Sequence, residues 1–172
     1  DLLYWNSDST NLPGPMYCWY LRNTYLENKL SQPNALTVCG EPLDLRRLDM
    51  PTFVYGSRED HIVPWDSAYA STQLMQGPTT FVLGASGHIA GVINPPQKNK
   101  RSYWTSGKAG AFPPTAKAWM ATAQEHPGSW WGTWADWLGT HSGKKIAAPK
   151  QPGSKKHRPI EPAPGRYVLR KA

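Results

Sequence analysis

The chain has 172 residues, a formal net charge of +7 and a pI near 9.5. That length allows one domain with a core, or a large part of a bigger domain. The sequence contains no run of about 18 apolar residues, which a membrane-spanning helix needs, and no signal-peptide pattern, so we expect a cytosolic protein without a membrane span. Two cysteines, Cys18 and Cys39, are too few for a disulfide framework and stand in no metal-ligand spacing, so we expect no metal site.

The positive charge is concentrated near the end of the chain. From Lys144 onward nine Lys and Arg residues stand against one acid, whereas residues 1–143 carry ten basic and eleven acidic groups. This stretch is also rich in Pro and Gly, which is more typical of a solvated extension than of a polyanion site. We therefore expect no nucleic-acid partner.

The first expected element is a helix over residues 16–30, after a Pro-Gly-Pro turn. Its aromatic side chains must cover another surface or be covered themselves; they are Tyr17, Trp19, Tyr20 and Tyr25. Cys18 falls in this helix and Cys39 lies beyond it. Neither follows a strand at a sharp elbow, so we interpret both as buried structural thiols and not as nucleophiles.

Two short apolar strands with a helix between them come next. The apolar runs at residues 52–56 and 80–83 predict buried strands, and residues 65–75 predict the helix. Strand, helix and strand within about 40 residues indicate an α/β fold, in which parallel strands are joined by a crossover helix. The loops that follow such strands gather at one edge of the sheet.

An Asp and a His occupy the loops after these two strands. Asp60 lies in GSREDHIVP, and His88 ends GASGH, 28 residues later. Either residue alone would be unremarkable, since an Asp in a turn is usually a cap or turn former. Together they match the order in which the acid and the histidine follow the nucleophile in α/β-hydrolases, so we expect Asp60 and His88 to meet as two members of a triad.

The third member of the triad is not evident. No Gly-x-Ser-x-Gly or Gly-x-Cys-x-Gly elbow occurs, so we expect the nucleophile to lie upstream of this chain. His61 competes with His88 for the role of base. Because His61 is adjacent to Asp60, it should point away from that carboxylate. We expect it either to pack around the catalytic residues without taking part in the reaction or to contact substrate.

Four of the nine tryptophans lie close together, in the stretch HPGSWWGTWADWLG. Their spacing places Trp130, Trp134 and Trp137 along one stripe of a helix. A helix packed by its aromatic face is the favoured interpretation. An exposed apolar surface for a partner remains the alternative.

Long blocks of the sequence resemble the carboxyl-terminal part of class I polyhydroxyalkanoate synthases. The blocks are DLLYWNSDSTNLPGPMYCWYLRNTYLEN, YGSREDHIVPW, VLGASGHIAGVINPP, EHPGSWW and EPAPGRYV. The resemblance is weakest over residues 142–157. It implies an α/β-hydrolase fold with a cap remnant over residues 1–35, the carboxyl-terminal part of the catalytic core over residues 36–142 and a basic tail over residues 143–172.

The resemblance also implies an activity. Such synthases are acyltransferases that polymerise (R)-3-hydroxyacyl units from coenzyme A thioesters through a Cys-His-Asp triad. His88 matches the histidine that activates the cysteine, and Asp60 matches the aspartate that acts on the attacking 3-hydroxyl group. The family's cysteine has no counterpart here, so this chain alone should be inactive without the missing amino-terminal part. No cofactor is implied, because the coenzyme A thioester is itself the substrate.

The resemblance also implies substrate contacts, an oligomeric state and a location in the cell. Asn28, Ile62 and Val63 should lie near the substrate path, and Ala90 should limit the room for the acyl side chain. A cytoplasmic homodimer at the surface of polyester granules is implied. Two alternatives stay open: an esterase or thioesterase of the same fold, and a non-catalytic granule-surface module suggested by the Trp-rich helix and the basic tail.

Overall fold

The computed structural model describes residues 3, 6–7, 9–107, 110, 112–166 and 169. The chain divides into two compact units, one formed by Glu27–Gly143 and the other by Asp1–Leu26 with Lys144–Ala172. We call Glu27–Gly143 the sheet unit. Among the described residues no helix is both long enough and apolar enough to cross a membrane.

The helix expected over residues 16–30 is shorter than predicted. It consists of α2, Gly14–Tyr20, and a π-helical turn, Leu21–Leu26. Asn28 then takes a left-handed conformation with φ of 44°, which an α-helix cannot pass through. The large side chains of α2 and the turn are exposed; they include Tyr17, Trp19, Tyr20 and Tyr25.

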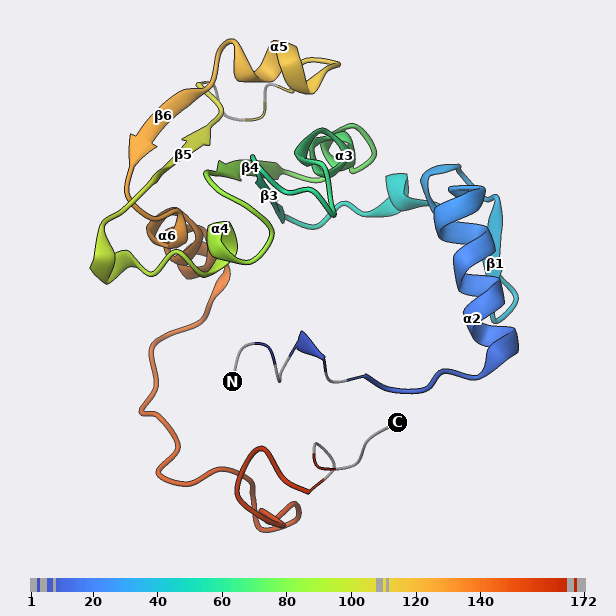
Figure 1. The fold of residues 1–172 in the computed structure, drawn as a ribbon, viewed down its shortest axis with the longest axis vertical. Helices are drawn as coiled ribbons and strands as arrows, with labels where there is room; N and C mark the ends of the chain where they lie inside the picture. Colours follow the sequence, from blue (N-terminus) through green and yellow to red (C-terminus); the bar gives the residue numbers. More distant parts are fainter. Residues whose placement is uncertain are drawn as a thin grey trace. The chain divides into compact units, whose positions relative to one another are not determined.

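The sheet unit alternates short strands with short helices (Figure 1). Its strands are β1 (Leu36–Val38), β2 (Glu41–Leu43), β3 (Thr52–Ser57), β4 (Thr79–Gly84), β5 (Ser102–Thr105) and β6 (Gln124–Pro127). Its α-helices are α3 (Trp65–Ala70), α4 (Ala90–Ile93), α5 (Ala116–Met120) and α6 (Trp131–His141). Its 3-10 turns are η2 (Lys29–Ser31), η3 (Leu45–Arg47), η4 (Ser71–Gln73) and η5 (Pro96–Lys98).

The main sheet has the strand order β3-β4-β5-β6. β3 and β4 are parallel, with Val54 opposite Phe81, and α3 forms the crossover between them, as the sequence predicts. β5 and β6 were not anticipated, and they extend the sheet in antiparallel fashion. The predicted parallel pairing is thus confirmed for β3 and β4, and the antiparallel β5 and β6 make the main sheet mixed. Within the described residues β3 has no strand on its other side.

Helices cover both faces of the β3 and β4 pair, because side chains alternate between the faces along each strand (Figure 1). On one face Phe81 and Leu83 pack with Tyr69 of α3 and Trp119 of α5, all nearly inaccessible to solvent. On the opposite face Phe53 stacks against aromatic side chains of the α6 region. This arrangement buries the strands and leaves the loops at their carboxyl ends free to carry polar groups.

Candidate active site

The loop after β3, which we call the Asp60 loop (residues 58–64), fixes the Asp60 carboxylate by backbone hydrogen bonds. The Asp60 amide donates to the Ser57 carbonyl over 3.1 Å. Its Oδ1 accepts from the amides of Ile62 and Val63, each over 2.9 Å. Asp60 is therefore a turn former, as an Asp in this setting usually is, and the turn leaves Oδ2 available for another partner.

That partner is His88. The imidazole Nδ1 lies 2.8 Å from Asp60 Oδ2, so the two loops meet as the sequence predicts. The carboxylate accepts the proton of Nδ1, which leaves Nε2 with the lone pair of a base. The His88 side chain is 42% exposed and that of Asp60 only 8% exposed, so solvent reaches the imidazole but hardly reaches the carboxylate.

The charge of Asp60 is stabilised by its neighbours. Burial acts to raise the pKa of the Asp60 carboxyl, but the hydrogen bonds from the Val63 amide, from His88 and from the Ile62 amide outweigh it and hold the pKa below its usual value. At neutral pH Asp60 is therefore an anion that can orient the imidazole and stabilise its protonated form.

Backbone hydrogen bonds tie the Asp60 loop to the His88 loop, residues 85–89. The amide of Arg58 donates to the Gly84 carbonyl over 2.8 Å, and the amide of Glu59 donates to the Ser86 carbonyl over 3.0 Å. Ser86 has a φ of 78°, which is rare for a residue with a side chain and turns the chain toward Asp60. The pairing of β3 with β4 thus continues into the loops that carry the two side chains.

A partly buried pair of hydroxyl groups, from Tyr55 and Ser57, lies at the carboxyl end of β3. The Tyr55 hydroxyl lies 3.1 Å from Ser57 Oγ, and burial raises the pKa of Tyr55, so its hydroxyl stays protonated. A Cβ at Gly91 would lie 2.7 Å from Ser57 Oγ and 2.8 Å from the Ala85 carbonyl, and one at Gly84 would collide with the Tyr55 ring. The sequence suggests that the small residues before His88 leave room for the imidazole; in the structure Gly84 makes room for Tyr55.

The Trp-rich segment supports the helix that follows His88. The indole N–H groups of Trp130 and Trp131 donate to the carbonyls of Gly91 and Val92 in α4, over 3.2 and 2.9 Å. Trp130 is buried, whereas the neighbouring Trp131 remains partly exposed.

The stripe predicted for α6 is only partly buried. Trp130 and Trp137 both contact Phe53, which confirms the packed aromatic face for these two residues. Trp134, predicted to share the stripe, is 37% exposed.

The structure places some of the remaining candidate residues on the loops that carry the pair, but not Asn28. Ile62 and Val63 are exposed on the Asp60 loop, as is His61 beside them. Ala90 is the first residue of α4, and its carbonyl accepts a hydrogen bond from the Arg101 guanidinium. The hydrogen bonds that the structure shows for Asn28 are made by its carbonyl and stay within residues 28–32, so nothing in the structure brings Asn28 to the pair. Its substrate contact, like those of the others, stays a prediction.

The interpretation of the two cysteines as buried thiols is wrong. Both side chains are free and belong to exposed residues. Cys39 lies at the tip of the hairpin formed by β1 and β2, where it and Gly40 both have positive φ, as a tight hairpin turn requires. The sequence signal was present, since Cys-Gly between two short β-prone runs is compatible with such a turn. No hydrogen bond among the described residues joins the Cys39 thiol to His88.

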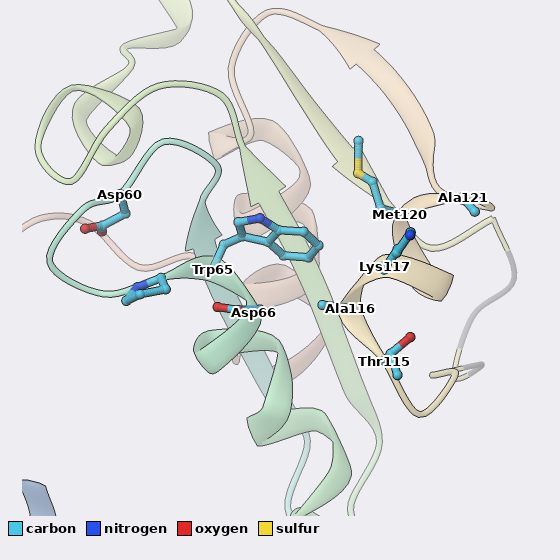
Figure 2. Close-up of a pocket in the computed structure, with 9 residues that line it drawn as sticks. Asp60, Trp65, Asp66, Thr115, Ala116, Lys117, Met120 and Ala121 are labelled. Atoms are coloured by element: carbon cyan, nitrogen blue, oxygen red, sulfur yellow. The ribbon is translucent and has the colours of Figure 1, made fainter.

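A cleft of about 800 Å³ begins at the Asp60 loop and runs between α3 and α5 (Figure 2). Its lining residues are Asp60, Pro64, Trp65, Asp66, Thr115, Ala116, Lys117, Met120 and Ala121. Figure 2 shows the Asp60 carboxylate pointing away from α5, and His88, the partner of that carboxylate, is not among the residues that line the cleft. Sequence reasoning missed this cleft because α5 is far from Asp60 along the chain.

The described residues contain no group of three or more His, Cys, Asp or Glu side chains placed to hold a metal ion. The contact between Asp60 and His88 offers the chemistry of a carboxylate and an imidazole acting together. Such a pair can activate a thiol or hydroxyl nucleophile and can return the proton to a leaving group.

Comparison with known proteins identifies close relatives. A polymerase subunit of Cupriavidus necator, the poly(3-hydroxyalkanoate) polymerase subunit PhaC, is 62% identical over 172 residues, which are all of this chain and 29% of that protein. The protein of the same name from Rhizobium etli is 43% identical over 170 residues, covering 98% of this chain and 26% of the relative. Poly(3-hydroxyalkanoate) polymerase 2 of Ectopseudomonas oleovorans is 40% identical over 169 residues, covering 98% of this chain and 30% of the relative.

No protein-family model matches the chain. The chain spans less than a third of the length of these curated relatives. The similarity nevertheless extends over essentially every residue of this chain, which confirms the resemblance seen in its sequence blocks. The chain is therefore homologous, over its whole length, to the carboxyl-terminal part of the poly(3-hydroxyalkanoate) polymerases.

Proposed function

We propose that this chain forms the carboxyl-terminal part of an acyltransferase that polymerises (R)-3-hydroxyacyl groups from coenzyme A thioesters and releases coenzyme A. One observation carries the proposal: the 2.8 Å contact between His88 Nδ1 and Asp60 Oδ2, in a chain that is 62% identical to a named polymerase. The nucleophile would be a cysteine supplied upstream of this chain. No cofactor is needed, because the thioester brings its own activated acyl group.

His88 would serve as the base for acylation. Its Nε2 takes the proton of the cysteine thiol, the thiolate attacks the thioester carbonyl, and the proton passes to the departing coenzyme A sulfur. A thioester on the enzyme is close in free energy to the thioester of the substrate, so acyl transfer to the cysteine has a reaction free energy close to zero. The exposure of the His88 side chain leaves this nitrogen accessible to a segment outside the chain.

Asp60 would matter most when the polymer grows. The 3-hydroxyl group that attacks the acyl-enzyme is a far weaker acid than a thiol, so its deprotonation depends more on the anion behind the imidazole. The low pKa of Asp60 keeps that anion in place at neutral pH. We therefore assign Asp60 to activation of the hydroxyl, in concert with His88.

The fold supports the same assignment. The parallel β3 and β4 with crossover helix α3 carry the acid and the histidine at their carboxyl ends, as in an α/β-hydrolase core. β3 is unpaired on one side within the described residues, which suits a sheet that continues in an upstream segment. On this basis residues 1–35 would belong to a cap, residues 36–142 to the core and residues 143–172 to a basic tail.

The setting of the enzyme is proposed on the same basis. We infer a homodimer in the cytoplasm that binds the surface of polyester granules. Exposed apolar side chains on α4 and α6 support a granule contact; they are Val92, Ile93, Trp131, Trp134 and Leu138. Fractionation of cells that make polyester would test this, because the enzyme should sediment with the granules.

The fate of a labelled acyl group tests the activity. The whole enzyme that contains this chain is incubated with radiolabelled (R)-3-hydroxybutyryl-coenzyme A, and the label is followed into insoluble polymer and into free acid. The proposal predicts label in polymer with release of coenzyme A. Label in free acid alone would show a thioesterase, and granule binding without any turnover would show a non-catalytic surface module.

A further inference from the structure

The cleft between α3 and α5 plays no part in the contact between Asp60 and His88. It holds about 800 Å³ and opens beside the loop that carries Asp60. We call its apolar lining, which includes the Trp65 ring, Ala116 and Met120, the floor of the cleft (Figure 2). A cleft of this size matches the space that proteins use for extended or drug-sized ligands.

Polar groups stand along the walls of the cleft. The Lys117 ammonium group and the Thr115 hydroxyl can both donate hydrogen bonds, and Thr115 also caps α5 by accepting from the Ala118 amide. Asp66 offers the one other carboxylate besides Asp60 among the lining residues, and its Oδ1 accepts from the Ser67 amide. The cleft thus combines an apolar floor with a few separate donors.

Exposed apolar residues connect Asp60 to the cleft along the chain. Ile62 and Val63 follow Asp60 and are 61% and 47% exposed. Pro64 comes next in the chain and already lines the cleft, followed by Trp65. Exposed apolar side chains that lead along the chain into a cleft are typical of a surface that binds a long apolar ligand.

We propose that this cleft binds the growing polyester, an extended chain of 3-hydroxyacyl units, as it leaves the active site. The inference rests on the proposed polymerase function. A polyester has apolar side groups and ester carbonyls that accept hydrogen bonds but no donors within the chain, which fits an apolar floor with donors from Lys117 and Thr115. Coenzyme A fits less well, because its several phosphate charges would meet one lysine and the Asp66 carboxylate.

A bulky substitution at the rim separates this role from catalysis. Ala121 lines the cleft at the end of α5 and is exposed, so Ala121→Trp should fill the cleft without disturbing the core. Ala118→Trp is the matched control, because Ala118 is exposed on the same helix and does not line the cleft. Neither position touches Asp60 or His88.

Two readouts on the whole enzyme test the proposal: coenzyme A release in the first turnover, and the rate and length of polymer formed from (R)-3-hydroxybutyryl-coenzyme A. In Ala121→Trp we expect an unchanged first turnover with elongation slower by about tenfold and shorter polymer. Ala118→Trp should behave as the wild type. If Ala121→Trp does not fold by circular dichroism, Lys117→Trp on the same wall takes its place.

The outcomes distinguish the cleft from the activity itself. Equal polymer length in Ala121→Trp and Ala118→Trp would overturn the cleft proposal while leaving the polymerase intact. Loss of the first turnover in Ala121→Trp alone would also overturn it, since the cleft would then serve the incoming thioester. A wild-type enzyme that makes no polymer would refute the proposed function instead.

Discussion

Two regions of the sheet unit differ in what holds their side chains in place. One is the pair of loops at the ends of β3 and β4, and the other is the core packed by α3 and α5. In the loops, polar side chains are placed by backbone hydrogen bonds such as those from Ile62 and Val63 to Asp60. In the core, Phe81 and Trp119 are buried to 1% exposure and pack with ring centroids 4.8 Å apart. The geometry of the Asp60 and His88 pair thus depends on the loops and most of the stability depends on the core, so a substitution in one region should affect the other region little.

His88→Ala should give the largest effect on chemistry and almost none on stability. Removing the base from the whole enzyme should slow acylation of the nucleophile by about 10²- to 10⁴-fold. The free energy of unfolding should change by less than about 0.5 kcal/mol, because the His88 side chain is 42% exposed. Rapid-quench measurement of coenzyme A release checks the rate, with His157→Ala in the exposed tail as control. Undiminished release would remove His88 from the mechanism.

Asp60→Asn should slow elongation much more than acylation of the nucleophile. The amide cannot stabilise a protonated imidazole, so elongation should fall by about 10²- to 10⁴-fold, while acylation by the more acidic thiol should fall much less. Acylation is followed by the first release of coenzyme A and elongation by polymer formed over time. A parallel fall in both rates would argue against a special role for Asp60 in hydroxyl activation.

Phe81→Ala should show the reverse pattern, with a large loss of stability. The cavity left between Tyr69 and Trp119 should lower the free energy of unfolding by about 3–5 kcal/mol. Urea unfolding followed by Trp fluorescence measures the loss. At a temperature where the variant is folded, the rate of acylation should stay near that of the wild type. A stable variant with lost acylation would show that the core and the loops are coupled.

The pH dependence of stability should give the smallest effect. The folded-state pKa of Asp60 is lowered, so its stabilising contribution is present above the pKa of the unfolded state, near 3.9, and is lost as pH falls through the folded value. The difference in unfolding free energy between the wild type and Asp60→Asn should therefore shrink as the pH falls below about 4. A difference that grows with acidity would mean that the sign of the shift is wrong.

The sequence predicted the part of the site that follows from the order of the strands, which is the meeting of Asp60 and His88. Apolar runs with loops at their ends were enough to bring Asp60 to His88. β5 and β6 escaped prediction because β6, Gln124–Pro127, is largely exposed and has no apolar alternation. The cleft escaped because it requires α5 to pack against α3, which is a tertiary contact that no local pattern encodes.

Backbone conformation accounts for the other differences. The helix predicted to reach residue 30 ends at Leu26, before the left-handed Asn28. The thiol of Cys39 is exposed because a tight turn places it at a hairpin tip. The Cys39-Gly40 pair was compatible with a turn, but the left-handed conformations of Asn28 and Cys39 themselves needed the structure.

The central claim is that Asp60 holds the His88 imidazole with its proton on Nδ1 and its lone pair on Nε2. Nitrogen-15 NMR of the histidine-labelled enzyme, at a pH where His88 is neutral, reports directly which ring nitrogen carries the proton. The account predicts the Nδ1–H form in the wild type and a loss of that preference in Asp60→Asn. A wild-type His88 with its proton on Nε2 would contradict it.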